Sequence, residues 1–157
     1  MLTILALAAA SAVQAAPSDR PTWATLRYSE ALRRGEFVYG FGNSSERTPQ
    51  AAWVRRTRIV DGVQTVDWAD GKRCPGVGRV VQALADLPPV KPRLPFGESD
   101  GEIITDGIGV TLDVESSYGS FYGTRLTIIT NVGTPLADFA ATLRRELEPC
   151  WSTTPPA

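Results

Sequence analysis

Residues 51–71, AAWVRRTRIVDGVQTVDWADG, constrain the fold of this chain more than any other stretch of its sequence. Two runs rich in β-branched residues flank the dipeptide Asp61-Gly62, which is typical of the two-residue turns that join antiparallel strands. Folding the chain about this turn also predicts a register, in which the opposed pairs are Val60 with Val63 and Arg56 with Asp67. The sequence therefore predicts at least one antiparallel hairpin.

One face of this predicted hairpin carries its larger apolar side chains, and we expect that face to belong to the core. Its members alternate along the two strands, and they are Trp53, Thr57, Ile59, Val66 and Trp68. The same register places Arg55 opposite Trp68, which predicts a cation–π contact between these two side chains.

The spacing of apolar residues predicts two helices later in the chain. The first helix follows Cys74 and begins at Pro75, and its apolar positions are Val77, Val80, Val81, Leu84 and Leu87. The second helix begins at Thr134-Pro135, and its apolar stripe consists of Leu136, Phe139, Ala140, Leu143 and Leu147. Each helix thus has one face that needs a partner to bury it.

Further strands are predicted on both sides of the first helix. A strictly alternating run at 108–115 predicts a half-buried strand, and residues 124–132 predict the strand that returns beside it. Nearer the N-terminus, residues 37–42 fit a short strand. Residues 22–28 fit either a strand or the beginning of a helix that runs to residue 34.

The first residues have the features of a secretory signal peptide. They carry no charged side chain before Asp19, and an apolar run at 2–10 precedes small residues that suit signal peptidase. The run is shorter than the roughly 20 residues that a membrane-spanning helix needs. We expect residues 1–16 to be removed and the mature protein to be periplasmic or secreted in a bacterium. The alternative is that these residues form a first helix of the folded domain.

Export changes the interpretation of the two cysteines of the chain. Cys74 lies at a predicted helix start beside Lys72 and Arg73, where a reducing compartment would favour a reactive thiol. In an oxidising compartment, two cysteines in a small exported chain indicate one disulfide. We therefore predict a bridge between Cys74 and Cys150, which would bring the start of the first helix to the end of the second.

These elements predict one domain of the α+β class. It would be an antiparallel sheet built from hairpins, with two α-helices packed on one face and one disulfide. The domain would span residues 17–151, with a proline-rich connector at 88–97 between two hairpin-helix halves and a disordered tail at 152–157.

Composition argues against several classes of function. The formal net charge is -1, so no basic surplus supports nucleic-acid binding. The chain has no histidine, which rules out a serine or cysteine protease triad within it and the common zinc sites. We expect no cofactor and no metal.

Four carboxylates gather just before the strand at 108–115, namely Glu98, Asp100, Glu102 and Asp106. They are read first as a solvated polar loop. They also form the basis of an alternative function, because glycan hydrolysis needs two carboxyl groups at a defined separation. Calcium binding is a further alternative for the same oxygens, although their spacing matches no standard calcium loop.

The segment between the last two predicted strands has the composition of a recognition loop. It combines serine and glycine with Tyr118, Phe121 and Tyr122, and tyrosine gives a large contact area at a small entropic cost. Tyr39 and Phe41 would join this surface if the two segments lie side by side. The alternative is that the aromatic residues pack inward.

Taken together, these features predict a small exported protein held by one disulfide. Its most plausible role is a non-catalytic binding or envelope-associated domain, with an envelope protein or glycan as the partner. The alternative is a carboxylate-based hydrolase that acts on an envelope glycan.

Overall fold

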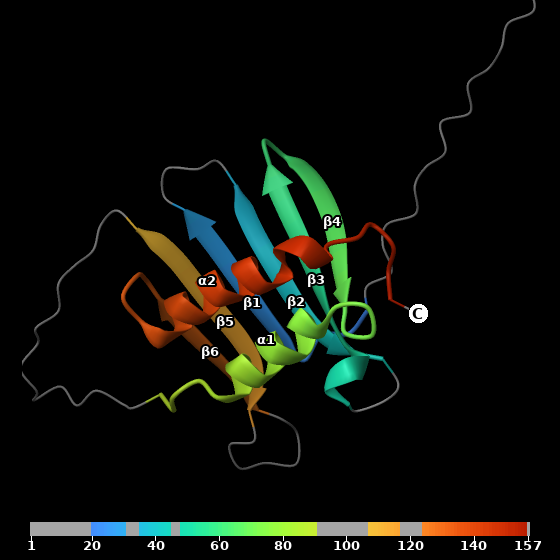
Figure 1. Ribbon diagram of the computed structural model, residues 1–157. Coiled ribbons are helices and arrows are strands. Elements are labelled where there is room, and N and C mark those ends of the chain that lie inside the picture. The colour runs from blue at the N-terminus through green and yellow to red at the C-terminus, as the bar shows by residue number, and fades with distance from the viewer. Residues whose placement is uncertain (1–19, 31–34, 45–47, 91–106, 117–123, 157) are drawn as a thin grey trace, which may run out of the picture.

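A computed structural model describes residues 20–30, 35–44, 48–90, 107–116 and 124–156. Within this part of the chain, six antiparallel strands form one sheet in the order β4-β3-β2-β1-β5-β6, and two α-helices lie across one of its faces (Figure 1). The elements are β1 (Ala24–Glu30), β2 (Glu36–Asn43), a 3-10 turn η1 (Pro49–Ala51), β3 (Ala52–Val60), β4 (Val63–Asp70), α1 (Pro75–Ala85), β5 (Ile108–Ser116), β6 (Thr124–Thr130), α2 (Pro135–Leu147) and a 3-10 turn η2 (Glu148–Cys150). The predicted α+β fold is confirmed, and the first of the two alternatives for residues 22–28, a strand, is the one observed.

The hairpin of β3 and β4 has the predicted turn and the predicted register. Asp61 has a φ of 49° and Gly62 a φ of 78°, so both central residues are left-handed, as a type I′ turn requires. Val60 pairs with Val63 and Arg56 with Asp67. The Arg55 guanidinium lies 5.9 Å from the centre of the Trp68 ring, which confirms the predicted cation–π contact.

The core lies between the sheet and the helices. Both helices bury the predicted stripes, and the sheet contributes alternate residues of its four central strands, among them Leu26, Tyr39, Phe41, Val54 and Leu112. We call this side of the sheet the helix-covered face and the opposite side the open face. Close packing of the two helices depends on Gly76, because a Cβ there would lie 2.8 Å from the main-chain oxygen of Glu146.

The prediction of which hairpin face joins the helix-covered core was wrong. That core receives Ala52, Val54 and Ala69, whereas Trp53 and Trp68 lie on the open face. Both indoles are nonetheless buried, with 1% and 2% of their surface exposed and their ring centres 5.3 Å apart. Burial without a covering helix is achieved because the Trp53 ring lies flat over Gly42, where any Cβ would collide with it.

The disulfide between Cys74 and Cys150 is present, as predicted, and its Cα atoms are 5.8 Å apart. It joins the residue before α1 to the end of η2, so the start of the first helix lies beside the end of the second. No helix among the described residues is long and apolar enough to cross a membrane. The predicted signal peptide, residues 1–16, lies outside the described residues.

The C-terminal segment departs from the predicted disordered tail. Ser152 forms an antiparallel bridge with Trp68, with N–H to O distances of 2.7 and 2.9 Å, and Pro156 is buried. The segment runs beside the β4 edge of the sheet (Figure 1). It therefore occupies the hydrogen-bonding groups that β4 would otherwise present at this point.

Candidate functional site

The residues predicted to bind or react fall into two groups. Tyr118, Phe121 and Tyr122 lie outside the described residues, and so do the carboxylates Glu98, Asp100, Glu102 and Asp106. Tyr39 and Phe41 are described, and the structure places both in the core with 2% and 0% exposure. The prediction that these two join an exposed binding surface therefore needs correction, because both point from β2 toward the helices.

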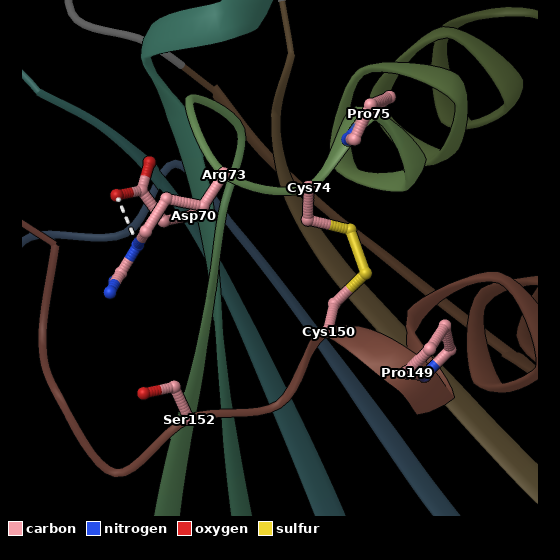
Figure 2. A pocket seen from close by; sticks show the side chains of 7 residues that line it. All are labelled: Asp70, Arg73, Cys74, Pro75, Pro149, Cys150 and Ser152. Atoms are coloured by element: carbon pink, nitrogen blue, oxygen red, sulfur yellow. Dashed lines mark hydrogen bonds and ion pairs between the residues drawn. A yellow bond between two sulfur atoms is a disulfide. The ribbon is translucent and has the colours of Figure 1, made fainter.

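A first candidate site is the cavity beside the disulfide, which has a volume of about 240 Å³ (Figure 2). Its polar lining residues are Asp70, Arg73 and Ser152. The Asp70 carboxylate accepts from the Lys72 main-chain N–H at 3.0 Å and from Arg73 Nε at 3.3 Å. These bonds close the turn between β4 and α1, so the polar groups serve the local fold, and both sulfurs are held in the bridge.

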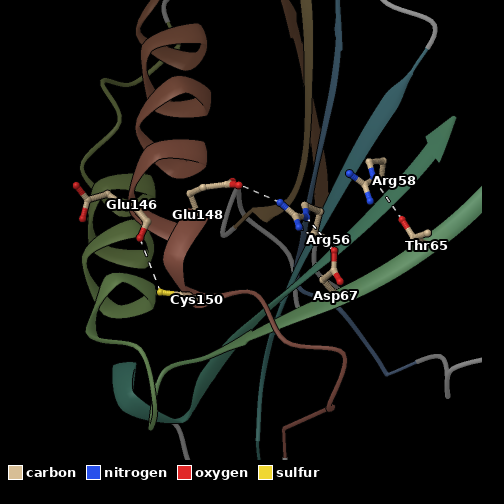
Figure 3. A network of polar contacts seen from close by, with 7 residues as sticks. All are labelled: Arg56, Arg58, Thr65, Asp67, Glu146, Glu148 and Cys150. Atoms are coloured by element: carbon tan, nitrogen blue, oxygen red, sulfur yellow. Dashed lines mark hydrogen bonds and ion pairs between the residues drawn. The ribbon is translucent and has the colours of Figure 1, made fainter.

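A second candidate is the charged network where η2 meets the β3–β4 hairpin (Figure 3). The Arg56 guanidinium lies 4.2 Å from the centre of the Trp151 ring, 2.8 Å from Asp67 and 3.6 Å from Glu148. A guanidinium stacked on an aromatic ring and paired with two carboxylates has most of its binding capacity already used. Arg56 therefore fastens η2 and Trp151 to the hairpin.

Arg144 makes a similar attachment from the middle of α2. Its guanidinium lies 4.6 Å from the ring centre of Tyr28 and 5.5 Å from that of Phe37, and it donates to Glu30 at 3.0 Å. Tyr39 lies between the two arginine stacks, and burial raises the pKa of its phenol to about 12. This side of α2 is thus closed by stacked and paired side chains and offers no evident room for a ligand.

The third candidate lies on the other side of α2. Leu87, Pro88, Pro89 and Val90, which we call the strap, follow α1 and run toward the start of α2 (Figure 1). Cavities of about 320 and 200 Å³ both take these four residues and Ile128 as lining. We call the two cavities together the strap groove.

Carbon atoms dominate the lining of the strap groove. Besides the strap, the larger cavity is formed by Trp23 and by apolar residues of α1, β5 and β6, namely Val81, Leu84, Ala85, Leu112, Val114, Leu126 and Ile128. The smaller one adds Thr130, Thr134, Pro135 and Leu136. Leu126 is 40% exposed and Val90 is 60% exposed, so apolar surface is left in contact with water.

The few polar atoms near the groove are bonded within the protein. Trp23 Nε1 donates to Asn43 Oδ1 at 3.2 Å, and Thr134 Oγ1 accepts from Thr130 Oγ1 at 2.9 Å and from the Ala137 N–H at 3.3 Å. What remains for a ligand is hydrocarbon and the face of an indole ring. Such a lining suits burial of an apolar ligand.

Sequence reasoning missed this groove because residues 88–97 were interpreted as a simple connector. One signal for it was present: the alternating positions of residues 108–115 and 124–132 predict an apolar face as long as two strands. Whether two helices cover that face depends on where they cross the sheet, which no local pattern shows.

Among the described residues, no group of three or more acidic or cysteine side chains is placed to hold a metal ion. Comparisons of the chain with protein-family models, with curated proteins and with solved structures found no match.

Proposed function

We propose that this chain is an exported binding protein that holds the acyl chain of a lipid in the strap groove. The observation that carries the proposal is the pair of adjoining apolar cavities beneath one short strap, with half-exposed leucine and valine side chains at their rim. Ligand sites in proteins are commonly concave, mostly apolar and about 300–1,000 Å³ in volume, a range that includes the larger cavity.

The form of the groove favours a hydrocarbon chain over a compact ring. The two cavities lie on either side of the strap and share its residues, so the apolar space is elongated and narrowed in its middle. A flexible chain can follow such a path, and burying it removes its surface from water together with that of Leu126 and Val90.

Export supports a lipid as the ligand. The signal-like residues 1–16 and the disulfide both fit an oxidising compartment of the bacterial envelope, where acyl chains are abundant. The mass of the protein recovered from its native host tests this part alone. We expect the loss of the first 15 or 16 residues and no thiol alkylation before reduction; a full-length mass with two free thiols would contradict export.

Ligand binding is tested with a fatty acid that carries bromine in its chain, because bromine quenches indole emission on contact. Trp23 lines the groove, whereas Trp53, Trp68 and Trp151 do not. We expect saturable quenching that is largely lost in Trp23→Phe.

A matched pair of surface substitutions controls this titration. Val90→Asp places a charge at the groove, and Val63→Asp places one at the β3–β4 turn, where the valine is similarly exposed. We expect Val90→Asp to weaken binding at least about tenfold, since a desolvated carboxylate opposes an acyl chain, and Val63→Asp to leave it unchanged. Absence of saturable quenching, or equal affinity of the two variants, would refute the proposal.

A further inference from the structure

We propose that β6 pairs with β6 of a second copy of this chain, antiparallel and about a twofold axis at Thr127, and that this dimer joins the two strap grooves. The inference goes beyond the binding function, because the pairing requires no ligand. It rests on the difference between the two sheet edges, on the sequence of β6 and on the place of β6 in the groove.

The two edges of the sheet are finished differently. At the β4 edge, the Ser152 bridge and the buried Pro156 cover the base of the strand. At the other edge, no described residue pairs with β6 on the side away from β5. Ile129, on the open face of this strand, is 78% exposed. Native proteins usually protect a long apolar edge strand, because it readily pairs with another chain.

The sequence of β6 is nearly self-complementary when it is read in opposite directions. β6 reads Thr-Arg-Leu-Thr-Ile-Ile-Thr from Thr124 to Thr130. Antiparallel pairing about Thr127 places Thr127 against itself, Thr124 against Thr130, Leu126 against Ile128 and Arg125 against Ile129. Threonine pairs and aliphatic pairs stabilise neighbouring strands, and this register opposes no like charges.

The aliphatic pairs of this register fall on the groove side of the sheet. Leu126 and Ile128 line the strap groove, on the same face as Leu112. The partner's Ile128 would lie beside Leu126, and the partner's Leu126 beside Ile128. The pairing therefore covers the half-exposed Leu126 and makes the two grooves continuous across the twofold axis, as an isologous contact does.

A single pair of seven-residue strands makes a small interface. Interfaces below about 1,200 Å² are usually weak or transient, so we expect dissociation constants in the micromolar range. Sedimentation velocity over a concentration series from about 1 µM to about 1 mM spans this range and gives the constant directly.

Ile129 offers a test of the register as well as of the contact. Its neighbour on β5 is Thr111, which is neutral, and its high exposure means that a substitution should leave the monomer folded. In the dimer it would face the partner's Arg125, and the twofold axis would repeat this pair. Ile129→Glu thus creates two attractive pairs, Ile129→Lys two repulsive ones, and Ile129→Gln neither.

We expect Ile129→Glu to dimerise at least about threefold more tightly than Ile129→Gln, and Ile129→Lys at least about threefold more weakly, at low salt. Circular dichroism and the melting temperature check that all three variants are folded. A protein that stays monomeric over the whole series, or glutamate and lysine variants with equal constants, would overturn the proposal. Neither result depends on whether a fatty acid binds.

Discussion

On the β2–β4 side of α2, two arginines stack on aromatic rings, a disulfide fixes both helix ends and the C-terminal segment covers the sheet edge. On the β5–β6 side, a strap of four residues covers two cavities, and the edge strand is exposed. The same sheet and the same helix thus have one side that is closed by specific contacts and one that is left apolar and open. The contrast suggests that stability is concentrated on the first side and leaves the second free for binding.

Removing the disulfide should have the largest effect on this contrast, because the bridge is the only covalent link on the closed side among the described residues. It joins residues separated by 76 positions, and a loop of that size contributes about 4 kcal/mol in the chain-entropy description. We expect the double variant Cys74→Ala/Cys150→Ala to lose about that much free energy of unfolding in urea denaturation. A loss below about 1 kcal/mol would show that the helix ends are held together by packing alone.

Two leucine truncations compare the sides directly. Leu143 of α2 is completely buried in the core, whereas Leu126 of β6 is 40% exposed at the groove. We expect Leu143→Ala to cost about 3 kcal/mol of unfolding free energy, since it leaves a cavity, and Leu126→Ala to cost less than about 1 kcal/mol. Similar losses in the two variants, measured by urea denaturation, would mean that the groove side is as tightly packed as the core.

Alkaline pH should weaken the closed side through Tyr39. Burial raises the pKa of its phenol from 10.0 to about 12, so the unfolded chain ionises first as the pH rises. The unfolding free energy should therefore be unaffected by this group below pH 10 and fall by about 1.4 kcal/mol per pH unit between pH 10 and about 12. In Tyr39→Phe this part of the decline should disappear. An unchanged slope in the variant, measured by denaturant titration at about pH 11, would assign the decline to other groups.

The features that were predicted correctly depend on short stretches of sequence or on simple counting. Asp61-Gly62 determines a turn, and the turn determines the register of β3 and β4. Two cysteines allow only one intramolecular bridge. Helix starts at Pro75 and Pro135 follow from local backbone chemistry.

The features that were missed depend on how distant elements meet. Trp53 and Trp68 made one hairpin face look like the core, but Gly42 on the neighbouring strand provides the flat surface that buries Trp53 elsewhere. Likewise, Ser152 belongs to a segment with no apolar pattern, and its order comes from an edge strand that only the folded sheet provides. The strap groove exists because α2 crosses the sheet at a particular place.

The position of β1 has a consequence for how the chain is made. It is the first strand of the described chain, yet it lies between β2 and β5, and its pairing with β5 joins Glu30 to Ile108. A ribosome adds roughly 5–20 residues per second, so one side of β1 waits several seconds for its partner to be synthesised. Throughout that delay the nascent β1–β4 sheet has a bare edge and an apolar face without α2. The order of synthesis thereby sets the period in which this chain most needs a chaperone.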